Sequence, residues 1–347
     1  MAVAPKKKTK PSKVSVEAVP EIQAKSLVEI AIEKFSAAKD SMMTQLSPML
    51  SNLFARKTMS PMKFTLPQNI LVVGAGGTGG WAAPKLAKII SDALNKRIVE
   101  HQVNVVFIDA DNVEMKNLRR QNFVQQDVGR NKAEVIATRY NHSVTNQNMR
   151  MSFIAAYMVD KGYPIPEDKA DQFVYIENVM ANCKKESYLV INLIDNMASR
   201  KAIHKFCYHN GVDVIDVANN DYNGQLNYAA YKSGLGHVGS FFAVYPEAAK
   251  DNDMIVLENC ADADVQATEQ LFNANDMAAT ILGTFLANAL ADGVIPHHHV
   301  SFCTGSNMSI TANHSFMAHL DTTTAPAEYL EATGAAIGGY DQLVKTF

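Results

Sequence analysis

The sequence predicts an α/β fold with a doubly wound, mainly parallel sheet and an antiparallel extension. Apolar, strand-like runs at 69–74, 103–111, 188–195 and 213–219 alternate with helical stretches, which is typical of a parallel sheet covered on both faces. The stretch 224–232 alternates apolar and polar residues and predicts the start of the antiparallel part. With 347 residues, 47% of them hydrophobic and 19% charged, the chain has ample material for a buried core.

The rest of the chain divides by composition. Residues 1–20 are rich in Lys, Pro and Ser and predict a disordered basic tail. Residues 21–60 carry apolar side chains at helical spacing and predict a helical N-terminal extension. The main domain is expected over 61–347, with a helix at 264–292 and a C-terminal tail at 320–347 that the pattern leaves unassigned.

Charge and cysteine usage exclude several classes of function. The net charge of −3 provides no global basic field, so we expect no direct binding of nucleic acid. No apolar run is long enough for a membrane span, and the N-terminal lysines precede no secretory signal. The cysteines contain no C-x-x-C pair, so we expect a cytoplasmic chain without a disulfide framework or a structural zinc. They are Cys183, Cys207, Cys260 and Cys303.

The first strand leads into a glycine-rich loop, "GAGGTGG", at residues 74–80. Gly74, Gly76 and Gly79 form G-x-G-x-x-G ahead of a helix expected over 79–95, and Gly77 belongs to the same loop. Such a loop gives a tight turn and close backbone approach to a phosphate, which the helix N-terminus then attracts. No G-K-[S/T] follows, so this is not a Walker loop. The loop predicts a nucleotide without specifying which one.

Polar and cationic side chains follow the second strand. Asp109 is placed to accept hydrogen bonds from ribose hydroxyls, but it lies 30 residues past Gly79, whereas dinucleotide enzymes space the pair by about 20. Amides and cations then accumulate at Asn117, Arg119, Arg120, Gln121 and Lys132. Phosphoryl or nucleotidyl transfer uses such groups against charge on phosphate oxygens, whereas a nicotinamide needs a flat apolar slot. An NAD(P)-dependent oxidoreductase is therefore the weaker alternative.

Several separated motifs then point to one family. "GAGGTGG", "IDADNVEMKNLRRQNF", "DVGRNKAEV" and "INLIDN" resemble the ThiF/MoeB superfamily of adenylating enzymes, which are related to ubiquitin-activating enzymes. Within it, "NDYNGQ" and "ENCADADVQATEQLFNANDMAA" resemble the ThiF-related protein of the PRTRC cassette. The resemblance covers residues 68–290 and implies a Rossmann-like adenylating fold.

The resemblance also implies an activity and a set of site residues. The chain would use ATP and Mg²⁺ to adenylate the C-terminal carboxylate of a small ubiquitin-fold or cassette-encoded protein, and it would form a homodimer. The nucleotide-binding set would be Gly74, Gly76, Gly77, Gly79, Asp109, Asp111, Asn117, Arg120, Gln121, Lys132, Asp195 and Asn196. Asp109 would bind ribose, Asn117, Arg120 and Gln121 would face the phosphates, and Lys132 would lie beside the α- and β-phosphates. Asp195 would hold Mg²⁺, since carboxylate oxygens suit this ion.

Some features depart from the family or stay open. Cys260 is the counterpart of a thioester-forming cysteine, although acidic neighbours would make it a poor nucleophile. Arg56 is the candidate for an arginine supplied by an N-terminal helix. His297–His299 precede a β-like run in which consecutive side chains alternate faces, which disfavours a shared metal. A non-catalytic adaptor that keeps the fold is a further alternative.

Overall fold

The computed structural model describes residues 62–181, 187–195, 197–233, 239–245, 248 and 271–313. The basic tail and helical extension expected before residue 61, with Arg56, lie outside these residues. Asn196, Cys260 and the tail at 320–347 also lie outside them.

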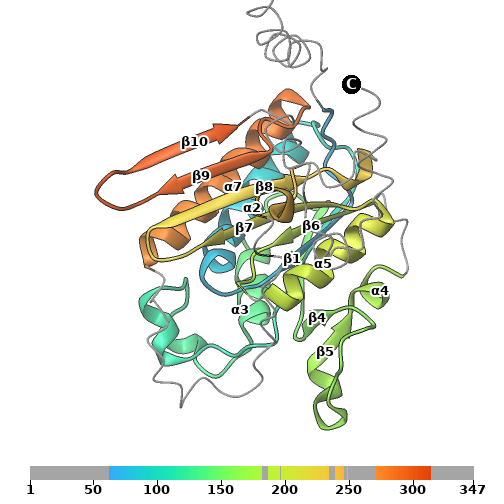
Figure 1. The fold of residues 1–347 in the computed structure, drawn as a ribbon, viewed down its shortest axis with the longest axis vertical. Helices are drawn as coiled ribbons and strands as arrows, with labels where there is room; N and C mark the ends of the chain where they lie inside the picture. The colour runs from blue at the N-terminus through green and yellow to red at the C-terminus, as the bar shows by residue number, and fades with distance from the viewer. Residues whose placement is uncertain are drawn as a thin grey trace, which may run out of the picture. The chain divides into compact units, whose positions relative to one another are not determined.

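The described residues form alternating strands and helices (Figure 1). The strands are β1 (Asn69–Val73), β2 (Val103–Ile108), β3 (Met149–Ile154), β4 (Tyr157–Val159), β5 (Phe173–Tyr175), β6 (Tyr188–Asn192), β7 (Asp213–Asn219), β8 (Asn223–Ala229), β9 (His299–Cys303) and β10 (Ser309–Asn313). The α-helices are α2 (Gly77–Asn95), α3 (Lys132–Asn141), α4 (Ile176–Val179), α5 (Met197–Asn210), α6 (Phe241–Val244) and α7 (Phe272–Asp292). The 3-10 turns are η1 (Met115–Arg119), η2 (Gln125–Asp127), η3 (Glu167–Gln172) and η5 (Tyr231–Ser233).

One large sheet organises the described residues, with eight strands in the order β10-β9-β8-β7-β6-β1-β2-β3. Strands β3, β2, β1, β6 and β7 pair in parallel. Strands β7 to β10 pair antiparallel. The prediction of a doubly wound, mainly parallel sheet with an antiparallel extension is confirmed.

Two apolar layers pack against this sheet. Helices α2, α3 and α7 cover one face, where Ile70, Val72 and Phe107 of the sheet meet Leu86 of α2 and Leu282 of α7. Helix α5 and the small β4–β5 sheet cover the other face through a second cluster of buried residues. The central strands are apolar on both faces because both are covered. None of the helices in the described part of the chain is long and apolar enough to cross a bilayer.

The element boundaries largely follow the sequence pattern. Strand β7 occupies 213–219, as expected, and β8 lies within one residue of the expected start at 224. Helix α2 begins at Gly77 rather than Gly79, so the glycine loop itself forms the first helical turn. Strand β6 ends at Asn192, and the expected strand residues up to 195 form a connection beyond it. Of the helix expected at 264–292, the described part is α7.

The connectivity creates a switch point beside β1. From β1 the chain proceeds outward to β2 and β3, and it then returns to β6 on the other side of β1 and continues to β7. In open α/β sheets, ligands bind beyond the carboxyl ends of strands at such a point. The glycine turn after β1 and the connection after β6 both lie there.

Candidate functional site

The glycine turn is fitted tightly against the end of β6. Gly74 has φ +98°, and a Cβ there would lie 2.9 Å from the carbonyl oxygen of Leu193. A Cβ on Gly79 would collide with the carbonyl oxygen of Gly74. The turn between β1 and α2 therefore requires glycine at these two positions. It also brings the chain after β6 against the N-terminus of α2.

Asp109 is bonded to the same turn. Its Oδ2 accepts a hydrogen bond from the backbone N–H of Ala75 at 2.7 Å, and its Oδ1 accepts one from the N–H of Asp111 at 2.9 Å. The pKa of Asp109 is raised to about 6, mainly by burial; Lys132 opposes this rise and Asp111 adds to it. The carboxylate expected to bind ribose thus lies next to the glycine turn, in an environment that penalises its charge.

Lys132 is a buried cation beside two acids. It is the first residue of α3, and its ammonium donates to Oδ2 of Asp111 at 2.8 Å. The hydroxyl of Tyr157 donates to the other oxygen of Asp111 at 2.6 Å. Burial lowers the pKa of Lys132, but Asp109 and Asp111 more than offset it, so the pKa is raised and the side chain stays charged. A fixed positive charge therefore lies beside Asp109.

The segment of the predicted phosphate ligands forms the 3-10 turn η1 and its continuation. Asn117 is buried, and its Oδ1 accepts from the N–H of Glu114 at 2.8 Å, so this amide oxygen stabilises the turn itself. The Nε2 of Gln121 lies 3.7 Å from where a Cβ on Gly76 would be. Gln121 is 9% exposed, and its Oε1 has no hydrogen-bond partner among the described residues. Gln121 thus presents a buried, unsatisfied acceptor beside the glycine turn.

Arg120 is anchored through its backbone. Its carbonyl oxygen accepts from the indole N–H of Trp81 at 3.4 Å and from Nδ2 of Asn275 at 3.3 Å. The ring of Trp81 also packs edge to face on Phe272, with 5.2 Å between the ring centroids. The Arg120 side chain is partly exposed, which suits a group that meets a ligand from solvent.

Asp195 lies in the connection after β6. Its side chain is exposed, three residues beyond the end of the strand and two residues after Leu193, which contacts Gly74. Arg200 holds this connection by donating from Nη2 to the carbonyl oxygen of Ile194 at 2.6 Å. The connection carrying Asp195 thus adjoins the same glycine turn as Asp109 and Gln121.

A buried polar network, not predicted from the sequence, is joined to this connection through Arg200. Asp216 of β7 is fully buried and contacts Arg200 at 3.3 Å, His204 at 3.0 Å and Asn192 at 2.8 Å. Burial raises the pKa of Asp216, but Arg200 and His204 lower it more, so the pKa falls below its usual value. The hydroxyl of Tyr231 lies 2.7 Å from the other ring nitrogen of His204. Asp216, in the middle of the apolar run of β7, is the signal that indicates such a network.

The consecutive histidines pack against the antiparallel strands. Nδ1 of His299 lies 2.8 Å from Oδ1 of Asn227, and Nδ1 of His298 lies 3.5 Å from the carbonyl oxygen of Tyr228. Among the described residues, no group of three or more His, Cys, Asp or Glu side chains is arranged to hold a metal ion. These histidines therefore contribute to packing and hydrogen bonding within the sheet.

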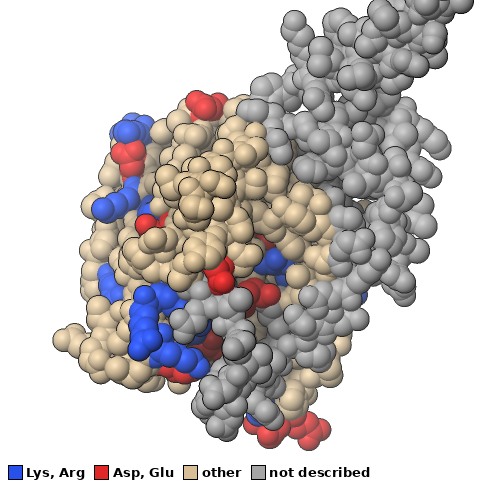
Figure 2. All heavy atoms as spheres, turned by 60° about the vertical axis from the view of Figure 1, so that its left-hand side comes forward, with Lys and Arg blue, Asp and Glu red and all other residues tan. Residues whose placement is uncertain are grey.

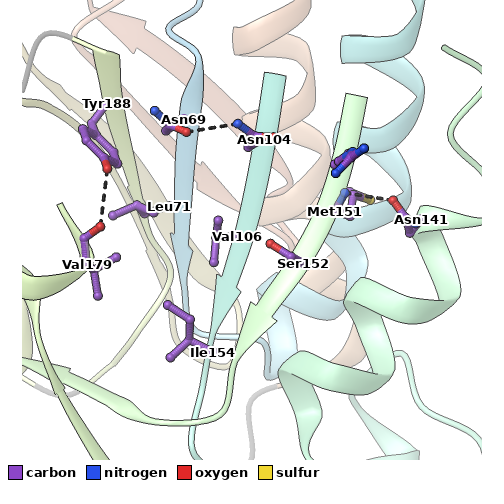
Figure 3. Close-up of a pocket in the computed structure, with 11 residues that line it drawn as sticks. Asn69, Leu71, Asn104, Val106, Asn141, Met151, Ser152, Ile154, Val179 and Tyr188 are labelled. Atoms are coloured by element: carbon purple, nitrogen blue, oxygen red, sulfur yellow. Dashed lines mark hydrogen bonds between the residues drawn. The ribbon is translucent and has the colours of Figure 1, made fainter. Parts of the chain in front are cut away.

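Figure 2 shows Lys and Arg side chains gathered next to Asp and Glu on the face in view, so the described part of this face carries both signs of charge. A pocket of about 670 Å³ lies on the face of β1, β2 and β3 (Figure 3). Its walls include Leu71, Val106 and Ile154, with the amides of Asn69 and Asn104 bonded to each other at 3.2 Å. None of the glycine-turn residues lines this pocket, so it is separate from the predicted nucleotide site.

Comparison with known proteins identifies the family. The model of the ThiF family matches residues 60–331, which is most of the chain. The chain belongs to the ThiF family. The superfamily resemblance is therefore confirmed, while the finer resemblance to the PRTRC subgroup stays a prediction.

Two curated relatives of this ThiF-family chain share only part of their length with it. It is 26% identical over 159 residues to SUMO-activating enzyme subunit 2 of Dictyostelium discoideum, covering 46% of this chain and 20% of that protein. It is 28% identical over 148 residues to tRNA threonylcarbamoyladenosine dehydratase of Escherichia coli K12, covering 42% of this chain and 44% of that protein. The matches thus span less than half of each relative.

Two solved structures have a similar fold at low sequence identity. A crystal structure of E. coli MccB with AMPCPP and MccA is 16% identical, with a TM-score of 0.48, over 71% of this chain and 63% of that chain. A crystal structure of PaaA is 17% identical, with a TM-score of 0.47, over 72% of this chain and 64% of that chain.

Proposed function

We propose that this chain is an ATP-dependent adenylyltransferase that activates the C-terminal carboxylate of a small ubiquitin-fold or cassette-encoded protein. The ThiF-family match supports the adenylating class. The names of two similar proteins, a SUMO-activating subunit and MccB crystallised with AMPCPP and MccA, agree with a nucleotide and a protein or peptide substrate.

The observation that supports this proposal most is the set of contacts around the glycine turn. Asp109 bonds the N–H of Ala75, Lys132 lies beside Asp109, and the amide of Gln121 lies beside Gly76. The helix N-terminus at this turn favours an anion. A ribose near Asp109 and phosphates near Lys132 would satisfy these groups together.

The chemistry of adenylation fits these groups. A carboxylate oxygen attacks the α-phosphorus of ATP, the new O–P bond forms an acyl-adenylate, and the bond to pyrophosphate breaks. The nucleophile is already ionised near neutral pH, so the site needs no general base. Because two anions meet, the positive charges of Arg120 and Lys132 would reduce their repulsion and stabilise charge in the transition state.

Magnesium fits the residues around Asp195. Mg²⁺ in nucleotide sites commonly uses one or two carboxylates together with phosphates and water, rather than an all-protein cage. An exposed carboxylate beside the glycine turn meets this requirement, and Asp195 provides one. When bound, the ion would offset charge on the phosphates.

Exchange of labelled pyrophosphate into ATP tests the proposal. The full chain is incubated with ATP, Mg²⁺ and each candidate acceptor protein, with acceptors lacking the C-terminal residue as controls. Exchange that depends on an intact C-terminus supports the proposed function. NAD binding without ATP binding would instead favour the oxidoreductase. ATP binding without exchange for any acceptor, with Arg120→Ala leaving biological function intact, would favour the adaptor.

A further inference from the structure

A chain of partly buried hydrogen bonds, made by one hydroxyl and two side-chain amides, connects the first turn of α2 to the segment that carries Arg120. Oγ1 of Thr78 donates to Oδ1 of Asn219 at 2.8 Å, and Nδ2 of Asn219 donates to Oδ1 of Asn275 at 3.0 Å. Nδ2 of Asn275 then donates to the carbonyl oxygen of Arg120 at 3.3 Å. Asn275 is fully buried, so each of its two polar ends has a defined partner at a site without competing solvent.

The start of α7, which carries Asn275, is fixed against α2. The ring of Phe272 packs on Trp81, and Asp276 forms an ion pair with Lys85 at 2.8 Å. The Asn275 amide occupies the space where a side chain on Gly77 would lie, because a Cβ there would be 2.6 Å from Oδ1 of Asn275. The position of this amide is therefore set by α2 itself.

The partner of Asn275 is the peptide group that joins two predicted nucleotide ligands. The carbonyl oxygen of Arg120 is followed at once by Gln121, whose amide lies beside Gly76 and whose buried Oε1 lacks a described partner. Because Asn275 holds this peptide group, it fixes the backbone positions from which the side chains of Arg120 and Gln121 extend. A buried, unpaired acceptor next to the held peptide indicates that the segment is arranged to meet a ligand.

We propose that Asn275 is a positioning residue for the nucleotide site, which holds the Arg120–Gln121 peptide so that the Arg120 guanidinium lies over the glycine turn. This inference rests on the proposed function, because it takes the phosphates of ATP as the ligand of Arg120. Asn275 acts through Arg120 and contacts no substrate itself.

A double-mutant cycle on ATP binding tests this role. ATP affinity is measured by calorimetry with Mg²⁺ for the wild-type chain, Asn275→Ala, Arg120→Ala and the double variant. We expect Asn275→Ala alone to weaken ATP binding about tenfold, because the carbonyl oxygen of Arg120 loses one of its two side-chain donors and keeps only the indole N–H of Trp81 at 3.4 Å. In the Arg120→Ala background, the same change is expected to weaken binding less than about twofold, since the group it positions is gone.

Controls separate positioning from a general loss of structure. Lys96→Met, at the far end of α2, removes an exposed ion pair with Asp92 that the proposal does not use, and we expect wild-type ATP affinity. Thermal melting of each variant reports folding. If Asn275→Ala does not fold, Asn275→Ser, whose hydroxyl is too short to reach the carbonyl oxygen of Arg120, provides the same comparison.

If Asn275→Ala weakens ATP binding only when Arg120 is present, the positioning role of Asn275 is supported. An equal loss in both backgrounds, or wild-type affinity in both position 275 variants, overturns it while leaving the proposed function standing. Absence of ATP binding by the wild-type chain overturns the proposed function and this inference together.

Discussion

The ammonium of Lys132 and the carboxylate of Asp111 form an ion pair of 2.8 Å in which the lysine is buried and the acid is half exposed. The burial is asymmetric, so the cation is held in place by the fold while the acid remains open to solvent. Asp109 also interacts electrostatically with this lysine. The resulting group of one cation and two acids determines how the site responds to pH.

The first prediction concerns Asp109 and stability. Its pKa is about 6 in the folded chain against an ordinary value of 3.8, so between these values the folded state binds more protons than the unfolded state. Rising pH through this window therefore lowers the wild-type free energy of unfolding through this group. Asp109→Asn lacks this effect, so the variant should gain stability relative to wild type from pH 4 to pH 7 in urea titrations. A difference that does not change with pH would contradict the prediction.

The second prediction concerns Lys132. Because its charge lowers the pKa of Asp109, Lys132→Met should move the titration of Asp109 above its wild-type value of about 6. Carbonyl NMR of the Asp109 carboxyl measures this directly. Lys96→Met, which removes an exposed pair with Asp92 at the far end of α2, should leave the titration unchanged. An unshifted Asp109 in Lys132→Met would refute the coupling between the two groups.

The third prediction compares two glycines with positive φ. Gly129 has φ +88° and nothing within 4 Å of an added Cβ, so Gly129→Ala should cost only the backbone strain, about 1–2 kcal/mol. Gly74→Ala should cost about 1–3 kcal/mol more, because its Cβ would also overlap the carbonyl oxygen of Leu193. Urea unfolding of both variants gives the comparison. Equal losses would show that the contact between the turn and the end of β6 contributes nothing.

The fourth prediction concerns the buried network. Arg200→Met leaves Asp216 fully buried without its main positive partner, so we expect a loss of about 3–5 kcal/mol in the free energy of unfolding. Arg130→Met removes an exposed pair with Glu134 and should cost less than about 1 kcal/mol. Chemical denaturation measures both. Similar small losses would mean that the network contributes little to the stability of the connection carrying Asp195.

Local features of this fold could be predicted from the sequence, while distant pairings could not. Strand β7 follows from an apolar run at 213–219, and the glycine turn follows from the spacing of Gly74, Gly76 and Gly79. The early start of α2 at Gly77 could not be predicted, because glycine has a low helix propensity. The sequence also does not reveal that Asn275 of α7 lies against this residue.

In the candidate site too, local features could be predicted from the sequence, while contacts between distant residues could not. The residue types around 109–132 predict a phosphate-binding segment, and the structure brings Asp109, Gln121 and Lys132 to the glycine turn or its neighbours. The hydrogen bond from Asn275 to Arg120 joins residues 155 positions apart, a pairing that only the packing of α7 on α2 creates. The end of β6 at Asn192 likewise depends on where β1 and β7 stop pairing with it.

We propose that positive side chains around the glycine turn hold the triphosphate of ATP. Calorimetry with ATP and with adenosine, on the wild-type chain and Arg120→Ala, measures this contribution. We expect Arg120→Ala to weaken ATP binding by at least about tenfold and to leave adenosine binding unchanged, because adenosine has no phosphate for this side chain to meet. Equal affinity of the two proteins for ATP, or tighter binding of NAD than of ATP, would contradict it.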